Sequence, residues 1–313
     1  MDDVLAVDLG GTRTRVALVA ADGQILAREA FQTPSDGTSP SAVTDAIAAA
    51  IRRISDGVPH AIGISAAGPL DLAAGAVVSP PNLPYDRMDL VGPLKAAFGV
   101  PVVLVNDARA GALGEHAHGA GRGCRDLVYV TISTGIGGGV IADGRLLLGR
   151  GGNAGEIGHI TVETRHGLVC GCSYPNHWEG YCSGRNLPRF YAVEKRSGDP
   201  VYSTAEAIFG AARSGVPAAR RFLKAVAVLN ARALSTLVVA YDPERIILDG
   251  GVIQAQADLL VGPAVARMEE FLPRPEVVTS PLAGDAPLLG AAVAARCGPG
   301  HEAYPPTRAM YSP

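Results

Sequence analysis

The fold is decided first by one stretch close to the N-terminus, Val4-Leu5-Ala6-Val7-Asp8-Leu9-Gly10-Gly11-Thr12. An apolar run here ends in a carboxylate and a Gly-Gly pair, and the residues that follow, Thr14 to Val19, alternate between polar and apolar. Such alternation predicts a strand, so the two glycines are expected to form the turn of a hairpin. Because glycine has no Cβ, the amides of this turn can approach phosphate oxygens, while Asp8 can hold a hydrated Mg²⁺ and Thr12 can donate to phosphate. The same residues are equally compatible with an ordinary hairpin.

Strand-like and helix-like segments alternate along the rest of the chain. Short apolar runs predict strands, and apolar residues at helical spacing predict helices. We expect further strands at 24–31, 60–65, 101–105, 127–133 and 245–248, and helices at 39–54, 91–98, 107–120, 204–241 and 287–297. The Pro- and Gly-rich stretch 67–89 is expected to be a long ordered loop, and 153–184 to be irregular. The alternation predicts an α/β protein.

The composition is that of an ordinary folded protein, with 48% hydrophobic and 18% charged residues in a chain of 313. A chain of this length can form two lobes, each with its own core. The formal net charge of −3 gives no global attraction to nucleic acid or to an anionic membrane, so neither partner is expected. No uninterrupted apolar stretch reaches the roughly 18 to 20 residues of a membrane span, and no signal-peptide pattern is visible. The predicted location is the cytoplasm.

Two further glycine-rich turns follow strand-like runs, Ser133-Thr134-Gly135-Ile136-Gly137-Gly138-Gly139 and Leu248-Asp249-Gly250-Gly251-Val252. The first lacks the Gly-Lys-Ser/Thr of a P-loop and no clear helix follows it, so neither a P-loop nor a dinucleotide fingerprint is indicated. Each turn alone could be a hairpin. Three such turns at strand ends indicate a nucleotide that is held by several of them.

The pair Asn106-Asp107 places a carboxylate directly after the predicted strand 101–105. Ligands of α/β proteins bind at the carboxyl edge of the sheet, where a carboxylate can accept the proton of a substrate hydroxyl. The competing interpretation is a helix N-cap, a role that suits both Asn and Asp. Taken by themselves, these two residues favour the cap.

The five cysteines also form a pattern, because three of them lie in one short segment. An odd number of cysteines argues against a disulfide framework. The cluster combines Cys170, Cys172, His177 and Glu179 with the preceding stretch Gly155-Glu156-Ile157-Gly158-His159. Cysteine and histidine ligands suit a tetrahedral zinc ion, and a structural site is favoured here over chance clustering.

Taken together, these motifs resemble the ROK sugar kinases in residues and in order, from about Val4 to the Ala-rich segment before Cys297. The resemblance implies an actin-like ATPase (ribonuclease-H-like) fold, with two α/β lobes and a central cleft for ATP and sugar. The expected lobes are 1–115, completed by the helix 287–297, and 116–286, which carries the zinc-binding loop 153–184. A flexible tail is expected at 298–313.

The resemblance also implies roles for individual residues, with Asp107 as the general base on the sugar hydroxyl. It places the sugar at Gly68, Asn82, Asn106, Asp107, Glu156, His159 and Glu179. Together with the glycine turns, it implies ATP and Mg²⁺ at Asp8, Gly10, Gly11, Thr12, Thr134, Gly135, Gly250 and Gly251. Zinc would be bound by His159, Cys170, Cys172 and His177, with His159 offering its second ring nitrogen to the sugar. The sequence departs from the family pattern at Ser173 and Asn176, which replace glycines, and at His177, which replaces a cysteine.

The expected activity is therefore ATP-dependent phosphorylation of a hexose, with glucose at O6 as the first candidate substrate. Alternatives within the family are an N-acylhexosamine kinase, acting on N-acetylmannosamine or N-acetylglucosamine, and a non-catalytic sugar sensor. A transcription repressor is disfavoured because Asp8 comes so early that no DNA-binding domain would fit before it. Family resemblance suggests a homodimer or homotetramer.

Overall fold

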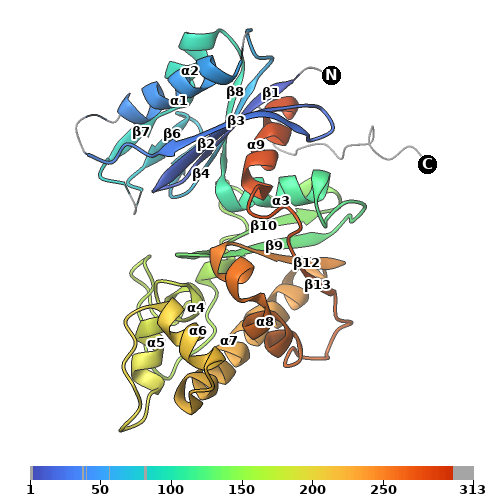
Figure 1. The fold of residues 1–313 in the computed structure, drawn as a ribbon. Coiled ribbons are helices and arrows are strands. Elements are labelled where there is room, and N and C mark those ends of the chain that lie inside the picture. Colours follow the sequence, from blue (N-terminus) through green and yellow to red (C-terminus); the bar gives the residue numbers. More distant parts are fainter. Residues whose placement is uncertain (1–2, 37–38, 40, 56, 81–82, 299–313) are drawn as a thin grey trace. The chain divides into compact units, whose positions relative to one another are not determined.

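The computed structural model describes residues 3–36, 39, 41–55, 57–80 and 83–298 of the chain. These residues form two compact units, shown in Figure 1. The first unit consists of Met1–Arg125, Gly139–Ala154 and Asp285–Pro313, and the second of Asp126–Gly138 and Gly155–Gly284. Both mix helices with sheets, so the predicted α/β class is confirmed. The expected sugar contact Asn82 and, apart from Gly298, the expected tail lie outside the described residues.

The first unit is built on a five-stranded sheet with the strand order β3-β2-β1-β4-β8. The strands are β1 (Val4–Leu9), β2 (Arg13–Val19), β3 (Ile25–Gln32), β4 (Ile62–Ala66) and β8 (Val102–Asn106). The first three form the predicted antiparallel meander, and β1, β4 and β8 run parallel. The carboxyl ends of the parallel strands therefore meet at one edge, where Asp8 and Asn106 lie.

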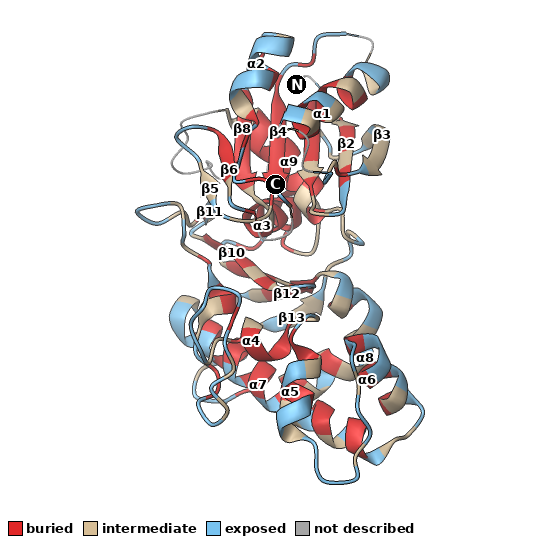
Figure 2. Cartoon of the chain, turned by 90° about the vertical axis from the view of Figure 1, so that its left-hand side faces the viewer, coloured by how far each residue is buried: buried red, intermediate tan, exposed pale blue. Residues whose placement is uncertain are grey.

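Helices cover both faces of this sheet (Figure 1). Helices α1 (Ser41–Ile54) and α2 (Val91–Phe98) share one apolar core with Ile62 and Ile64 of β4. Successive strand residues face opposite sides, so Gly63 faces the other side, where a Cβ would lie 1.8 Å from the Ala291 carbonyl of α9 (Ala286–Cys297). Figure 2 shows the strands buried between these layers. The C-terminal helix thus completes the first unit.

Residues 67–89 contain regular structure that the sequence did not predict. Three short strands, β5 (Leu70–Asp71), β6 (Ala76–Val78) and β7 (Arg87–Asp89), pair antiparallel in a small sheet. Expecting only a loop here was wrong. Strands of two or three residues are too short to show alternation, and the sheet is stabilised by burial of single side chains such as Val77 and Met88.

A second five-stranded sheet has the order β11-β10-β9-β12-β13. Its strands are β9 (Leu127–Ile132), β10 (Ile136–Ala142), β11 (Arg145–Leu146), β12 (Arg245–Asp249) and β13 (Glu276–Thr279). Strand β12 is parallel to both of its neighbours, β9 and β13. Strand β13 escaped prediction because its four residues are exposed or half-buried and carry no apolar run.

The helices of the second unit differ from expectation in number and in bounds, and the first three of them were not expected. They are the short η1 (Ile157–His159) and α4 (Glu179–Cys182), then α5 (Leu187–Glu194), α6 (Ala205–Arg213), α7 (Pro217–Tyr241) and α8 (Gly251–Val265). The single helix expected at 204–241 is two helices, because Gly215 takes φ +88° and Pro217 begins a new helix. Helix α8 directly follows the third glycine turn, where no helix was expected.

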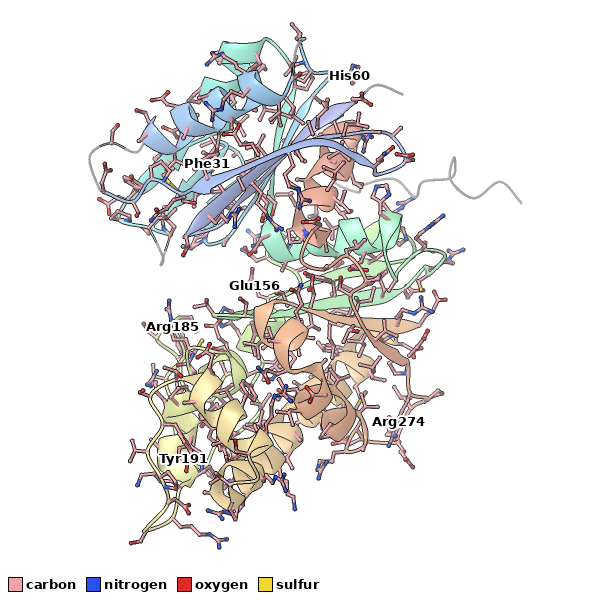
Figure 3. The ribbon with its side chains drawn as sticks, viewed as in Figure 1. Phe31, His60, Glu156, Arg185, Tyr191 and Arg274 are labelled. Atoms are coloured by element: carbon pink, nitrogen blue, oxygen red, sulfur yellow. The ribbon has the colours of Figure 1, made fainter. Side chains whose placement is uncertain are left out.

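Aromatic residues fill the core around α7. Tyr191, labelled in Figure 3, meets Phe222 edge to face with 5.2 Å between ring centroids, and Phe222 also contacts Phe190. Among the described residues, α7 is the one helix long and apolar enough to cross a membrane by length and composition. Its most apolar window is 67% buried inside the protein, as in the core helix of a folded domain.

Candidate active site

The first glycine turn, between β1 and β2, has a geometry that requires glycine. The Gly10 amide donates to the Arg13 carbonyl at 3.2 Å, and a Cβ on Gly10 would lie 2.7 Å from that same oxygen. Thr33, the residue that follows β3, fixes the turn. Its amide donates to the Thr12 carbonyl, and its hydroxyl donates to the Gly10 carbonyl. Three hydrogen bonds therefore fix the backbone of the predicted phosphate turn.

The carboxylate of Asp8 stands opposite Arg15 in the β1–β2 register. Arg15 donates to Asp8 Oδ2 through Nη2 at 2.6 Å and through Nε at 3.1 Å, and the Ser65 hydroxyl donates to Oδ1 at 3.1 Å. Arg15 also pairs with Asp285 at 2.9 Å, and Asp285 pairs in turn with Arg28. Arg15 was not identified from the sequence, although a tight hairpin places a residue seven positions after Asp8 opposite it, where a basic side chain can pair with the carboxylate.

Asn106 and Asp107 mark the junction between β8 and α3 (Asp107–His118). The Asn106 side-chain oxygen accepts from the amides of Ala108 and Arg109, which makes Asn106 the N-cap of α3. Its side-chain nitrogen donates to Asp107 Oδ1 at 2.9 Å. The Ala108 amide also donates to Asp107 Oδ1 at 2.8 Å. Asn106 is therefore the main cap of the helix, and the half-buried Asp107 carboxylate shares one of its amides.

In the second unit, the glycine run is joined to Glu179. The Ser133 amide donates to the Gly135 carbonyl, and this turns the chain between β9 and β10. Glu179 Oε2 accepts from the Ile136 amide at 3.0 Å, and a Cβ on Gly135 would lie 2.5 Å from that oxygen. A residue expected at the sugar and a residue expected at ATP therefore lie in contact, and glycine is needed at 135 to admit the carboxylate.

The four expected metal ligands converge in the second unit. The ligand atoms of His159, Cys170, Cys172 and His177 all lie within 4.8 Å of one another. Cys170 Sγ is 3.6 Å from His159 Nδ1, and Cys172 Sγ is 3.1 Å from His177 Nδ1. A tetrahedral zinc site with ordinary Zn–S and Zn–N bonds separates sulfur and nitrogen by about 3.6 Å. The residues therefore fit a Cys₂His₂ zinc site.

The pKa shifts of two residues in this cluster act in opposite directions on metal binding. Burial raises the pKa of Cys170 to about 12, with the neighbouring Glu179 carboxylate adding to the effect. Without a cation the thiol is protonated and donates to Glu179 Oε1 at 3.3 Å. Burial, and then the nearby His159 ring, lower the pKa of His177 and so favour the neutral imidazole that binds metals.

His159 presents its two ring nitrogens to different groups. Nδ1 faces Cys170, whereas Nε2 lies 3.9 Å from Glu156 Oε2. Glu156, labelled in Figure 3, lies just before η1 with its side chain 47% exposed. This arrangement suits the dual role expected of His159, since the nitrogen remote from the metal cluster lies beside another expected sugar ligand.

The third glycine turn leads from β12 into α8. Gly250 takes φ +92°, and a Cβ there would lie 2.5 Å from the Ile132 carbonyl. It stands at the N-cap position, and no side chain caps the helix. The preceding Asp249 is 1% exposed and accepts from the Tyr129 hydroxyl at 2.9 Å and from Gln254 Nε2 at 2.7 Å.

The expected site residues divide between the two units. Asp8, Gly10, Gly11, Thr12, Gly68, Asn106 and Asp107 belong to the first unit, where Gly68 takes φ +97° after β4. The second unit contains Thr134, Gly135, Glu156, His159, Glu179, the other metal ligands, Gly250 and Gly251. Within the second unit, the metal cluster, Glu179 and Gly135 form one connected group.

The family model described as "ROK family" matches residues 4–297. This chain belongs to the ROK family. It is 34% identical over 314 residues to the glucokinase of Streptomyces coelicolor, a match that covers 93% of this chain and 97% of the relative. It is 32% identical over 296 residues to the N-acetylmannosamine kinase of Shigella flexneri, covering 94% and 98%. A solved ROK glucokinase of Streptomyces griseus, in complex with glucose and AMPPNP, has a TM-score of 0.77 and 34% identity, covering 95% of this chain and all of that one.

Proposed function

We propose that this chain, an ATP-dependent sugar kinase of the ROK family, phosphorylates glucose at O6, with Asp107 as the general base. Kinases among its ROK relatives support the reaction class, and the glucokinase that holds glucose and AMPPNP supports the two substrates. The observation that carries the role of Asp107 is the division of labour at the β8–α3 junction. Because the Asn106 side chain accepts from both Ala108 and Arg109, the helix is capped without the single hydrogen bond that Asp107 Oδ1 accepts from the Ala108 amide.

In this proposal ATP and sugar occupy a cleft between two actin-like lobes. Asp107 takes the proton of O6 as that oxygen forms its bond to the γ-phosphorus. The bond from phosphorus to the β,γ-bridging oxygen breaks, and its electron pair leaves with ADP. The amides of the three glycine turns stabilise the phosphoryl oxygens. Asn106 steadies Asp107 through the 2.9 Å hydrogen bond to Oδ1.

Two metal ions belong to the proposal. Mg²⁺ would neutralise charge on the β- and γ-phosphoryl oxygens. Asp8 would hold it through a water, because both carboxylate oxygens already accept hydrogen bonds from Arg15 and Ser65. Zinc would be structural, held by His159, Cys170, Cys172 and His177. Glu156, Glu179 and His159 Nε2 bind sugar hydroxyls, as do Gly68 and Asn82 of the first lobe.

The substrate is tested by an ADP-release assay with Mg·ATP against glucose, mannose, fructose, glucosamine, N-acetylglucosamine and N-acetylmannosamine. Strong turnover of glucose with weak turnover of the N-acetyl sugars is the expected result. Preference for an N-acetyl sugar would overturn the choice of glucose and leave the mechanism in place. No turnover of any sugar by folded, zinc-loaded protein would overturn the kinase assignment and favour a sugar sensor.

The second candidate is an N-acylhexosamine kinase, and it is favoured by the 32% identity to an N-acetylmannosamine kinase over nearly the full chain. The remaining parts of the proposal are a cytoplasmic location, a homodimer or homotetramer, and lobes close to 1–115 with 287–297 and 116–286. Gel filtration with light scattering tests the oligomer.

A further inference from the structure

Trp178 is the single tryptophan of the chain and stands between two site residues, the expected metal ligand His177 and Glu179. Its side chain is fully buried, and its indole Nε1 donates to Asn230 Oδ1 at 2.8 Å. Asn230 is 5% exposed and lies in the middle of α7, about fifty residues further along the chain. A hydrogen bond between two buried side chains is costly to leave half-made, so this contact fixes the position of the indole.

The segment that carries the metal ligands has little regular structure and is stabilised chiefly by its own backbone hydrogen bonds. Thr161 pairs with His177 in an isolated bridge, Val162 donates to the Asn176 carbonyl, and Trp178 donates to the Ile160 carbonyl. These contacts fix the segment against itself, so its position relative to the rest of the second unit depends on contacts with other elements.

Helix α7 provides two such contacts from neighbouring positions. Asn230 accepts from the indole, and Arg232 donates to the Val162 carbonyl at 3.1 Å and lies 3.6 Å from the buried carboxylate of Glu163. Of these two residues, Asn230 acts closer to the site. It fixes Trp178, which is covalently joined to His177 on one side and to Glu179 on the other.

Movement of Trp178 would displace several groups together. Its carbonyl accepts from the amides of Tyr181 and Cys182, and this begins the short helix α4 that carries Glu179. Glu179 in turn contacts Cys170 Sγ through Oε1 and the Ile136 amide through Oε2. A rotated indole would therefore shift a metal ligand and a sugar ligand at the same time.

We propose that Asn230 is a positioning residue which, through Trp178, sets the places of His177 and Glu179 and so couples retention of the metal to binding of the sugar. The sugar half of this inference rests on the proposed function. The metal half rests on the cluster geometry alone. Asn230 touches neither the metal cluster nor the reacting atoms in this scheme.

The test compares Asn230→Leu, which keeps the side-chain size and removes the acceptor, with Ser235→Ala on the same helix. Ser235 is a matched control, because it is also buried and its hydroxyl accepts from the Glu269 amide at 2.9 Å, a contact outside the metal-binding segment. Asn230→Asp restores an oxygen acceptor and is the rescue variant. Trp178→Phe removes the donor from the other side and is the second variant should Asn230→Leu fail to fold.

Three readouts are measured on the full chain: release of zinc to a chromophoric chelator, tryptophan emission, and the separate kcat and KM for the sugar. Loss of a residue that orients metal ligands weakens metal binding by about tenfold or more. We expect Asn230→Leu to release zinc at least about tenfold faster and to raise the sugar KM by a similar factor, with kcat within about threefold. Its emission should shift, since all of it comes from Trp178. Trp178→Phe should reproduce the zinc and KM effects, and Asn230→Asp should reverse part of them.

The proposal would be overturned if Asn230→Leu gave the same zinc release, tryptophan emission and sugar KM as Ser235→Ala. An additive double variant of Asn230→Leu and Trp178→Phe would also overturn it, because one shared contact can be lost only once. Zinc release and emission do not require turnover. If they respond while the wild-type chain phosphorylates no sugar, the proposed function fails and the metal half of the inference stands.

Discussion

Two strand-to-helix junctions, one in each unit, both contain an aspartate but use it in opposite ways. At β8–α3 the Asn106 side chain caps the helix by accepting from two amides, and the half-buried Asp107 follows as the first helical residue. At β12–α8 the buried Asp249 precedes the helix and is bound by Tyr129 and Gln254, while Gly250 leaves the helix without a side-chain cap.

The difference shows what each junction offers to a ligand. The first satisfies its helix amides internally and presents a carboxylate, as a proton acceptor requires. The second uses its carboxylate internally and presents uncapped backbone amides at the positive end of a helix, as a phosphate site requires. A Gly or an Asn at the cap position therefore decides whether the junction presents uncapped backbone amides or a capped helix with a carboxylate beside it.

The largest expected effect comes from exchanging the two carboxylates for amides. Asp107→Asn should lower kcat by about 10³-fold, because a positioned general base contributes about 10² to 10⁴, while sugar affinity changes little. Asp249→Asn is the matched control and should keep kcat within about threefold while lowering the free energy of unfolding by about 2 kcal/mol. For both variants, steady-state kinetics measures kcat and urea unfolding measures the free energy of unfolding. Near-normal turnover by Asp107→Asn would remove the base assignment.

A smaller effect is expected from the two adjacent glycines of the second junction. Gly250→Ala should lower the free energy of unfolding by about 2 to 4 kcal/mol, because it combines a left-handed backbone with a Cβ that meets Ile132 O. Gly251→Ala meets only Ser133 Oγ, at 3.8 Å, and should leave stability unchanged. If ATP phosphates approach these amides, Gly251→Ala should still raise the KM for ATP by about tenfold. An unchanged KM in that variant would place the phosphates elsewhere.

The smallest effect separates the two tasks of Asn106. Asn106→Asp keeps a good N-cap, so the melting temperature should change little. It replaces the amide donor to Asp107 Oδ1 by a like charge, and it should lower kcat by about three- to tenfold and raise the pKa seen in the acid limb of the kcat profile. A pH–rate profile alongside thermal unfolding measures both. Loss of stability without a kinetic change would mean that Asn106 acts only as a cap.

Sequence alone could predict the strands and helices whose apolar patterns are long. The meander of β1 to β3 and the helix α2 (Val91–Phe98) lie within a residue or two of expectation. Strands β5 to β7 and β13 were missed, because two to four residues carry no measurable periodicity. The four metal ligands were correctly expected to come together, since Cys and His in one segment have few other uses in such a pattern.

Partners remote in sequence could not be predicted. The pairing of Arg15 with Asp285 depends on a residue 270 positions away, just before α9, and that of Trp178 with Asn230 depends on tertiary packing. Local patterns specify which element forms, whereas these contacts depend on where the elements meet. Asn230 in particular looks like an ordinary polar residue of an amphipathic helix until its neighbour is known.

The closest helix contact of the first unit has a consequence for biosynthesis. A Cβ on Gly290 of α9 would lie 1.7 Å from the Ala110 carbonyl, and one on Gly114 of α3 would lie 2.1 Å from the Ala286 carbonyl, so the two backbones touch. The ribosome makes α3 before α9, with all of Gly155–Gly284 emerging between them. The second unit therefore has its whole sequence available first, and the helix that begins at Asp107 waits for its partner until Gly284 has been added to the chain.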